Sequence, residues 1–502
     1  MTCETTAPGA SGHLNMAEPS LLRAGSLISG NWQGDGVGVP VINPATGLPV
    51  FTMAHCDTPA VTPAVNAGQA AMVHWQRLLP ARRGGILRKW ATLMRTHADD
   101  LARIITVEQG KPLAESFGEI EYGAGFLDWF ASEGERFGAM THPGHRPDMF
   151  TMNMMQPVGL SVAITPWNFP IAMIARKAGA ALAAGCAMIV KPACETPLSA
   201  NALAVLAQQA GVPPGVFQVI HGDPARMSTA LMEHPDVRAV SFTGSTRVGR
   251  ILLAQAARTV KRCSMELGGN APFIVFADAD LDLAVKGCMA AKFATSGQDC
   301  LAANRIYVHH SLHDAFVEKL AQRVAALRVG QGCDPRSEIG PMTVPGAVKK
   351  CRGLLQNATA QGAEIIAHSA PVPKEGYFVQ PTLLCGVTDD MAIAREEIFA
   401  PLLGVLTFSD THEVITRANA TEMGLAAYVY TRSLARAQMV SQALAFGMVA
   451  VNTPGFTGPP LPFGGWKQSG LGREGGVTGI YEYLENKNVS YGGMSPSVMA
   501  AE

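Results

Sequence analysis

The sequence predicts an α/β protein built on doubly wound parallel sheets. Between residues 160 and 257, short β-branched strands alternate with helical segments of roughly ten to fifteen residues. A second alternating region runs from Arg305 to about Val451. At 502 residues, 48% of them hydrophobic and 16% charged, the chain is long enough for about two to four domains. Such sheets bind ligands at the carboxyl ends of their strands.

The first elements precede the alternating regions. Residues 1–24 are expected to be a disordered lead-in, because the first twenty residues contain no apolar core. Short extended pieces from Leu27 to Phe51 are separated by turn residues, which predicts β-hairpins. Apolar residues at helical spacing then predict helices over 63–79, 82–97 and 98–108 and a long helix that includes 117–131.

The alternating regions are predicted element by element from their apolar patterns. In the first region, strands are expected at 160–164, 188–190, 216–220, 239–242 and 261–265, with helices from near 171, at 198–210, through 232 and at 247–257. A helix is expected at 280–292, between the two regions. In the second region, helices are expected at 313–327 and 346–361, and strands at 305–308, 364–367 and 381–385. The proline-rich segment 452–462 predicts a loop, which is followed by a helix at 476–484 and an extended segment at 486–491.

Composition narrows the kind of ligand. Lysine and arginine total 39 and aspartate and glutamate 40, so there is no electrostatic reason to expect nucleic acid or a membrane as partner. The most apolar segment, Ala178 to Val190, is shorter than the ~20 residues that cross a bilayer. The ten cysteines show neither Cys-x-x-Cys spacing nor a Cys/His cluster, so no metal site and no disulfide framework is expected. A small-molecule ligand and a reducing cytoplasmic location follow.

Cys300 lies in a turn between the helix at 280–292 and the strand at 305–308. Ser296-Gly297 break the helical pattern, and a turn of small residues gives a substrate carbon access to the thiol. A thiolate is a strong nucleophile where its pKa is lowered or a base is near. From this turn alone, an inert buried cysteine is the more common outcome.

Polar residues also follow several predicted strands. Asn168 stands on a strand-to-helix turn, where its amide can cap the helix or donate to a ligand oxygen. Lys191 ends the next strand, and Gly244-Ser245 precede a helix, where they form either a plain turn or a pyrophosphate cradle. Glu266 is followed by Gly268-Gly269, which permit close approach of a ligand. No Gly-x-Gly-x-x-Gly follows a strand, so the usual dinucleotide fingerprint is absent.

A set of short motifs gives the chain a resemblance over about residues 25 to 493. It resembles the NAD(P)-dependent aldehyde dehydrogenase superfamily, and most closely the succinate-semialdehyde dehydrogenase type. The motifs, in the family's order, are Thr165-Pro166-Trp167-Asn168-Phe169-Pro170, Lys191-Pro192-Ala193, Phe242-Thr243-Gly244-Ser245-Thr246, Met265-Glu266-Leu267-Gly268-Gly269, Gly297-Gln298-Asp299-Cys300, Glu397-Ile398-Phe399 and Pro462-Phe463-Gly464-Gly465.

The resemblance implies two doubly wound domains and a β arm. Residues 25–145 and 160–268 correspond to the cofactor-binding domain and residues 269–484 to the catalytic domain. Residues 146–159 and 485–502 correspond to the oligomerisation arm, so a homodimer or homotetramer is expected.

The resemblance also implies the catalytic roles. Cys300 attacks the aldehyde carbon, and Asn168 donates to the oxyanion together with the backbone N–H of Cys300. Glu266 activates the water that releases the thioester and is a candidate base for the thiol. Retention of Glu266 favours hydrolysis over transfer to coenzyme A.

The expected cofactor is NAD or NADP. The resemblance places Glu397 on the nicotinamide ribose and Lys191 on the adenosine ribose. NAD-specific members often have Glu three positions after this Lys, where it repels a 2′-phosphate, and this chain has Cys194 there, so NADP should be tolerated. The residues implied around the cofactor are Trp167, Lys191, Ala193, Cys194, Gly244, Ser245, Leu267, Glu397 and Phe399.

Substrate identity rests on fewer residues. Arg176 matches an arginine that holds a substrate carboxylate in succinate-semialdehyde dehydrogenases, and a surface or interdomain ion pair is the alternative. The second such arginine is Ala294 here, and Asp299 replaces the usual Thr beside the nucleophile. We expect a small semialdehyde such as succinate semialdehyde. The alternatives are an uncharged aldehyde, a thiol esterase or CoA-acylating activity, and a non-catalytic binding protein on the same fold.

Overall fold

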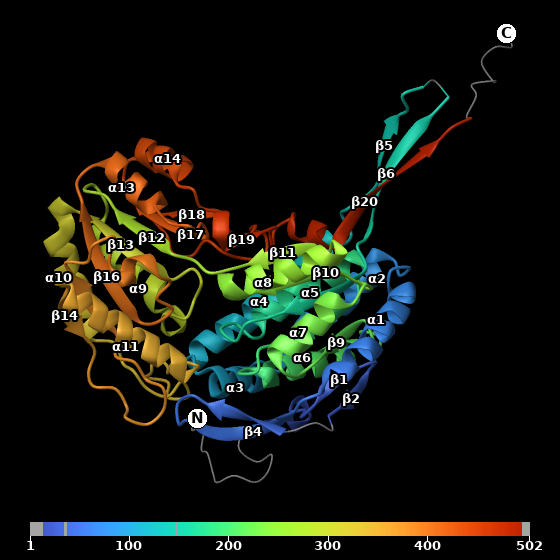
Figure 1. Cartoon of the computed structure of the whole chain (residues 1–502), viewed down its shortest axis with the longest axis horizontal. Coiled ribbons are helices and arrows are strands. Elements are labelled where there is room, and N and C mark those ends of the chain that lie inside the picture. The colour runs from blue at the N-terminus through green and yellow to red at the C-terminus, as the bar shows by residue number, and fades with distance from the viewer. Residues whose placement is uncertain (1–13, 35–37, 147, 494–502) are drawn as a thin grey trace.

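Two α/β lobes and a projecting β arm make up the protein (Figure 1). The computed structural model describes residues 14–34, 38–146 and 148–493. Parts of two predicted segments, residues 1–13 of the lead-in and 494–502 of the arm, lie outside the described residues. Within the described ranges, no helix is both long and apolar enough to cross a membrane.

The described part of the predicted lead-in is ordered, contrary to expectation. Pro19–Leu21 form a 3-10 helix, and Leu21 is buried. The backbone N–H groups of Ala17 and Glu18 donate to the carboxylate of Asp100 at 2.9 and 2.8 Å. The anchor is distant in sequence, so the composition of the segment did not reveal it.

The first lobe is built on an eight-stranded sheet. Its strands are β1 (Ser26–Ile28), β2 (Asn31–Gln33), β7 (Leu160–Ile164), β8 (Met188–Lys191), β9 (Phe217–Val219), β10 (Val237–Thr243), β11 (Arg262–Glu266) and β19 (Gly470–Leu471). They are ordered β19-β11-β10-β7-β8-β9-β1-β2. The five strands from β11 to β9 are parallel, whereas β1 and β19 pair antiparallel at the two edges. The predicted parallel sheet is confirmed, and the antiparallel edges are additions to it.

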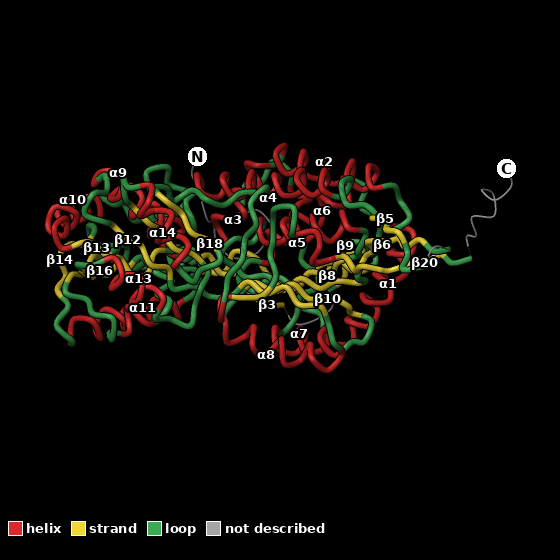
Figure 2. Tube along the Cα trace, turned by 90° about the horizontal axis from the view of Figure 1, so that it is seen from above, coloured by secondary structure: helices red, strands yellow, loops and turns green. Residues whose placement is uncertain are grey.

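Helices cover both faces of this sheet. They are α1 (Val61–Trp75), α2 (Pro80–Thr96), α3 (Ala98–Gln109), α4 (Leu113–Glu133), α5 (Ala172–Ala184), α6 (Pro197–Ala210), α7 (Pro224–Glu233) and α8 (Thr246–Ala256), with 3-10 turns at Thr58–Ala60 and Ala257–Thr259. Helices α4, α5 and α6 lie on one face, and α7 and α8 lie on the other (Figure 2). The lobe is therefore doubly wound.

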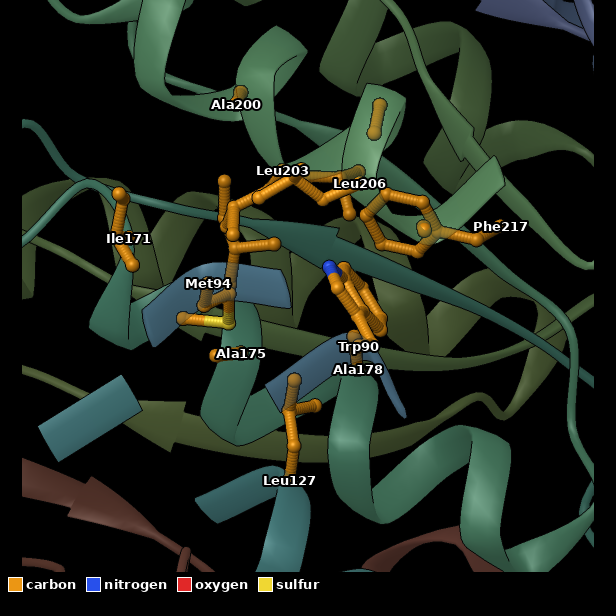
Figure 3. Close-up of a cluster of buried hydrophobic side chains, with 14 of the residues drawn as sticks. Trp90, Met94, Leu127, Ile171, Ala175, Ala178, Ala200, Leu203, Leu206 and Phe217 are labelled. Atoms are coloured by element: carbon orange, nitrogen blue, oxygen red, sulfur yellow. The ribbon is translucent and has the colours of Figure 1, made fainter. Parts of the chain in front are cut away.

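An apolar cluster fills the space between the sheet and the helices of the first face (Figure 3). Trp90 of α2 packs edge-on against Phe217 of β9, with ring centroids 5.0 Å apart. Met94, Leu127 and Leu203 surround this pair from three helices. Burying side chains of this size contributes roughly 1.5–3 kcal/mol each, which fixes the helices against the sheet.

The second lobe repeats the architecture on a seven-stranded sheet. Its strands are β12 (Ala271–Val275), β13 (Ala303–His309), β14 (Glu364–His368), β15 (Thr382–Cys385), β16 (Leu402–Phe408), β17 (Ala426–Tyr430) and β18 (Met448–Val451), ordered β14-β15-β16-β13-β12-β17-β18. Only the pairing of β14 with β15 is antiparallel among those of the strands described in this sheet.

The helices of the second lobe divide between its two faces. They are α9 (Leu281–Phe293), α10 (His313–Ala325), α11 (Pro345–Ala360), α12 (Ala392–Arg395), α13 (Thr411–Asn419) and α14 (Leu434–Ala443), with 3-10 turns at Ala294–Gly297 (η4), His310–Leu312 and Lys467–Ser469. One apolar cluster includes residues of α9 and α10, and a second includes residues of α11, α13 and α14.

A three-stranded antiparallel sheet forms the arm. It contains β5 (Met140–Pro143), β6 (Phe150–Pro157) and β20 (Leu484–Tyr491), and it projects from the first lobe (Figure 1). The sheet begins at Met140, ahead of the predicted boundary at 146. The segment before β20 is a 3-10 helix, Gly479–Tyr483, in place of the predicted α-helix. A separate hairpin pairs β3 (Gly38–Asn43) with β4 (Leu48–Ala54).

Candidate functional site

A cavity of about 670 Å³ is lined by residues of both lobes. The first lobe contributes segments that follow β7, β10 and β11, together with parts of α4 and α5. The second lobe contributes the turn before β13, the start of α11 and the segment before β16. Cys300, Glu266 and Asn168 all line this cavity, so residues that are far apart in sequence meet in one place.

The turn before Cys300 has an unusual backbone. The φ values of Thr295, Ser296 and Gly297 are 50°, 56° and 73°. Residues other than glycine rarely adopt this left-handed backbone conformation. The backbone N–H of Thr295 donates to both carboxylate oxygens of Glu115 on α4, each at 3.0 Å. The backbone N–H of Thr343 donates to the Gln298 side chain at 2.9 Å. Contacts from both lobes therefore hold this conformation in place.

The segment after β11 passes close to the nucleophile candidate. A Cβ added at Gly269 would lie 2.5 Å from the backbone oxygen of Cys300, so only glycine permits this approach. The backbone N–H of Gly269 donates to the Glu397 carboxylate at 2.9 Å. Glu266, three residues earlier, is thereby held on the same wall as Cys300.

Asn168 reaches across to the second lobe. Its side-chain Nδ2 donates to the backbone oxygen of Gln298 at 3.1 Å, and the residue is only 6% exposed. It does not cap α5, because Glu119 accepts the N–H groups of Ile171 and Ala172 at 2.8 and 3.2 Å. The helix-cap interpretation of Asn168 is therefore wrong, and its amide lies beside the nucleophile turn.

A buried ion pair supports the Asn168 turn. Lys111 Nζ lies 2.6 Å from the Glu119 carboxylate, and neither side chain is exposed. The same ammonium donates to the backbone oxygen of Asn168 at 2.7 Å. Each charge is thus satisfied by several hydrogen bonds, which is what burial of an ion pair requires.

Glu266 is buried with both carboxylate oxygens lacking a hydrogen-bond partner among the described residues. Burial raises the pKa of Glu266 well above its ordinary value, and the nearby Glu474 carboxylate raises it further. The charges of Arg176 and Lys177 oppose this rise. A carboxylate with a raised pKa and free lone pairs is a stronger base than an exposed one, which suits it to accept a proton.

Arg176 also lines the cavity, but its guanidinium has a partner within the protein. Its Nε lies 2.6 Å from Glu474, and Lys177 contacts the other oxygen of the same carboxylate. The guanidinium carbon lies 4.3 Å from the centroid of the Phe463 ring. The two interpretations of Arg176 are compatible, because an arginine in an ion pair still has further N–H groups.

The Cys300 thiol is held in its neutral form. Burial raises its pKa well above the ordinary value, and the carboxylates of Asp299, Glu397 and Glu266 act in the same direction. Only Arg176 is among the main charges that oppose them. A base is therefore needed to generate the thiolate.

Six of the residues implied around the cofactor line the same cavity: Trp167, Gly244, Ser245, Leu267, Glu397 and Phe399. The Trp167 and Phe399 rings meet edge to face with centroids 5.6 Å apart. Ser245 caps α8 by accepting the N–H of Val248 at 3.4 Å. Burial raises the pKa of Glu397 to about 7.

Lys191, Ala193 and Cys194 are not among the residues that line this cavity. They lie at the carboxyl end of β8, the strand beside β7. Lys191 Nζ donates to the backbone oxygen of Pro192 at 2.9 Å and lies 3.7 Å from Cys194 Sγ. The residues predicted for the adenosine end therefore lie along the same sheet edge.

The sequence did not single out the buried charges that support the site. Lys111, Glu119, Lys177 and Glu474 are all buried polar residues. Lys111 and Glu119 are 8 residues apart, but Lys177 and Glu474 are separated by 297 residues. The only local signal was the break in the helical pattern at Gly110-Lys111-Pro112. Across the part of the chain that the structure describes, no group of three or more His, Cys, Asp or Glu is arranged to hold a metal ion.

Comparison with known proteins places this architecture among well-characterised relatives. Residues 32–489 match the profile of the aldehyde dehydrogenase family. The non-phosphorylating aspartate-semialdehyde dehydrogenase of Halomonas elongata is 51% identical over 484 residues, which cover 95% of this chain and 98% of that protein. The NADP(+) succinate-semialdehyde dehydrogenase of Escherichia coli is 47% identical over 95% of this chain and 100% of its own. The crystal structure of a succinate-semialdehyde dehydrogenase from Burkholderia pseudomallei superimposes with a TM-score of 0.94 at 46% identity, and the match covers 95% of this chain and 100% of that one.

Proposed function

The chain belongs to the aldehyde dehydrogenase family, and from this premise we propose that it oxidises a small semialdehyde, such as succinate semialdehyde, through a covalent intermediate on Cys300. The family consists of oxidoreductases that use NAD or NADP. The observation that supports the proposal for this chain is the meeting of Cys300, Asn168 and Glu266 in one cavity.

The first step is addition of the Cys300 sulfur to the aldehyde carbon. The S–C bond forms, the carbonyl π electrons move to oxygen, and the thiol proton passes to a base, for which Glu266 is the candidate. The Asn168 amide, which donates to the Gln298 carbonyl at 3.1 Å in the structure, would donate to the developing oxyanion. Donors of this kind contribute ~3 to 4 kcal/mol to the transition state when measured by removal.

Collapse of the oxyanion would release the aldehyde hydrogen as hydride to NAD or NADP, when bound, and leave a thioester on Cys300. The second half-reaction hydrolyses this thioester. Water attacks the acyl carbon as Glu266 accepts its proton, the C–S bond breaks, and the electron pair returns to sulfur. The free lone pairs and raised pKa of Glu266 suit this role. The products are the carboxylic acid and the regenerated thiol.

The cavity suits NAD or NADP, which supplies the hydride acceptor when bound. Ser245 stands at the N-terminus of α8, an eleven-residue helix whose end favours a phosphate. A Cβ at Gly268 would lie 2.9 Å from the Glu397 carboxylate, so the glycine leaves room for this side chain on the cavity wall. Glu397 would hold the nicotinamide ribose and Lys191 the adenosine ribose, with Trp167, Ala193, Cys194, Gly244, Leu267 and Phe399 around them.

Arg176 is the proposed holder of the substrate carboxylate. It is 1% exposed, lines the cavity, and keeps its Nη1 free of a partner among the described atoms. A guanidinium matches a planar carboxylate, and a buried free donor favours an anion over water.

The β arm is the proposed site of assembly into a homodimer or homotetramer. Its three strands extend away from the first lobe, as Figure 1 shows, and many of its side chains are exposed. An unpaired strand edge of this kind can extend a neighbour's sheet. This part of the proposal is tested by measuring the oligomer size in solution. Shortening residues 484–491 should cause the oligomer to dissociate.

An aldehyde panel tests the activity. The protein is incubated with NAD or NADP and succinate semialdehyde, butanal or benzaldehyde, and reduced cofactor is followed at 340 nm. Cys300→Ala is expected to abolish oxidation while cofactor binding, measured by fluorescence, persists. Cys263→Ala, which removes a half-buried thiol outside the cavity lining, is the matched control and should behave like the parent.

Two results would contradict the proposal. Substantial turnover by Cys300→Ala would show that the Cys300 thiol is not the nucleophile. A rate that depends on added coenzyme A, with an acyl-CoA product, replaces hydrolysis by thiol transfer.

A further inference from the structure

We propose that the semialdehyde bound in this cavity also carries an ammonium group, accepted by the carboxylates of Asp299 and Glu115, so that the substrate is an amino-acid semialdehyde. This inference rests on the proposed function and specifies the substrate class of the same site. Its starting point is that acidic side chains outnumber basic ones on the cavity lining.

Asp299 stands directly before Cys300 and faces the cavity. The residue is half-buried, and one carboxylate oxygen accepts the backbone N–H of Leu301 at 2.9 Å. The Cys300 side chain also hydrogen-bonds to this carboxylate. Because a carboxylate has about four acceptor positions, further positions remain for a ligand. Glu115, half-buried on α4, lines the same cavity and accepts only from the backbone N–H of Thr295 among the hydrogen bonds described.

Neither carboxylate forms an ion pair in the described part of the chain, although the charge of Lys111 acts on both. Lys111 and Arg176 are the cations whose charges act on Asp299. Lys111 is already paired with Glu119 and Arg176 with Glu474, each at 2.6 Å. The charges of Asp299 and Glu115 repel each other, and a cation beside them would offset both this repulsion and the cost of burial.

An unpartnered donor in the same cavity independently indicates an anionic group on the ligand. Arg176 is 1% exposed and its Nη1 has no hydrogen-bond partner among the described residues. Its Nη2 reaches the Met173 sulfur at 3.1 Å, and the guanidinium also hydrogen-bonds to the side chain of Tyr122. Buried donors are rarely left unsatisfied, and a substrate carboxylate oxygen is a fitting partner. Arg176 thus offers a cationic donor, while Asp299 and Glu115 offer anionic acceptors, and together they are the complement of a zwitterion.

The same arrangement couples binding to thiol activation. Asp299 and Glu266 both disfavour the Cys300 thiolate. An ammonium group placed at Asp299 would cancel part of this effect at the moment when the aldehyde is next to the sulfur. A carboxylate-only substrate has no group that could do this.

The alternative is that Asp299 only shapes the turn. Its bond to the Leu301 N–H is an Asx-type contact that an asparagine oxygen makes equally well. Asp299→Asn therefore keeps the turn and removes the charge, which separates the two roles. Glu115→Gln does the same for the bond to Thr295.

Four aldehydes form a two-by-two test of charge. They are butanal, 4-oxobutanoate, 3-aminopropanal and 2-amino-4-oxobutanoate, which carry no charge, an anion, a cation and both. The parent is expected to show kcat/KM about tenfold to a hundredfold higher for the zwitterion than for 4-oxobutanoate, as for one charge-assisted hydrogen bond. Asp299→Asn should abolish most of this advantage and Glu115→Gln part of it.

The matched control is Asp282→Asn, which removes an exposed carboxylate on α9 and should leave the ratio unchanged. A parent that prefers 4-oxobutanoate, or a ratio unaffected by Asp299→Asn, would overturn the inference. If no aldehyde in the set is oxidised, the proposed function itself fails.

A binding measurement decides the inference independently of turnover and of variant folding. Alkylation of Cys300 by iodoacetamide in the parent is followed by mass spectrometry of its peptide, with the product acids aspartate or succinate present. Aspartate should protect at concentrations at least tenfold lower than succinate. Equal protection would refute the ammonium site.

Discussion

The Nε of Arg176 lies 2.6 Å from the carboxylate of Glu474, and both side chains are almost completely buried beside the cavity. Lys177 shares this carboxylate, so two cations and one anion leave a net positive charge behind Glu266. This group of charges determines how readily Glu266 gives up its proton. Several measurable consequences depend on it.

Glu474→Gln should move the acid limb of the pH profile for thioester hydrolysis to lower pH. The Glu474 charge raises the pKa of Glu266, and its removal also frees Arg176 and Lys177 to stabilise the ionised base. Because a base works only when ionised, a lower pKa extends activity towards acid. Single-turnover hydrolysis rates between pH 5 and 9 measure the shift. The exposed Glu485→Gln is the control, and a profile identical to the parent would show that Glu474 does not act on the base.

The same substitution should lower stability. Removing one member of a buried ion pair leaves its partners uncompensated, at a cost of ~3 to 5 kcal/mol. Urea denaturation of Glu474→Gln against the parent measures this cost. A difference below ~1 kcal/mol would mean that Arg176 and Lys177 find new partners.

Glu266→Gln should slow release of the acid more than formation of the acyl-enzyme. The amide cannot take a proton from water, so a burst of reduced cofactor followed by a slow steady state is expected. Stopped-flow absorbance resolves the two phases. Equal slowing of burst and steady state would assign Glu266 to activation of the thiol instead.

Arg176→Ala should cost ~2 to 4 kcal/mol in kcat/KM for succinate semialdehyde, the range for truncating a charge-assisted pair. Butanal lacks the carboxylate, so the change in its kcat/KM measures the effect of losing the Arg176–Glu474 ion pair alone. The ratio of kcat/KM for succinate semialdehyde to that for butanal is therefore the measurement. Arg176→Lys keeps the charge but lacks the planar guanidinium, so its ratio should lie between those of the parent and Arg176→Ala. An unchanged ratio in Arg176→Ala would remove Arg176 from substrate binding.

Cys194→Glu should shift preference from NADP towards NAD. Cys194 lies 3.7 Å from the Lys191 ammonium at the end of β8, and a carboxylate there would sit against a 2′-phosphate. The ratio of kcat/KM for the two cofactors measures the effect, with Cys194→Gln as the uncharged control. If the ratio does not fall, the 2′ position lies elsewhere.

The parallel sheets were predictable because each strand and helix has its own local pattern. Leu160–Ile164 was predicted to the residue, and the residues at its end were placed at the correct sheet edge. The edges were less predictable: β19 has only two residues and depends on its pairing with β11. The ordered structure of the described lead-in likewise depends on hydrogen bonds to Asp100, a residue that lies outside that segment.

The site was predictable where a motif is contiguous and less so where charges meet through the fold. The motif around Asn168 identified the residue, but not that Glu119, from α4, takes over the helix cap. Arg176 was singled out by position, whereas Glu474 lies 298 residues later and has no local pattern that links the two. Long-range electrostatic pairing requires the tertiary structure.

The left-handed turn at Thr295 and Ser296 links the two lobes at the nucleophile. Glu115 holds it from α4, while Thr343 of the second lobe bonds both Gln298 and the backbone oxygen of Gln109 at the end of α3. Separating these few contacts takes far less free energy than unfolding either lobe. On gradual heating, inactivation should therefore precede the loss of helical structure, and an enzyme cooled in time should recover without having to refold.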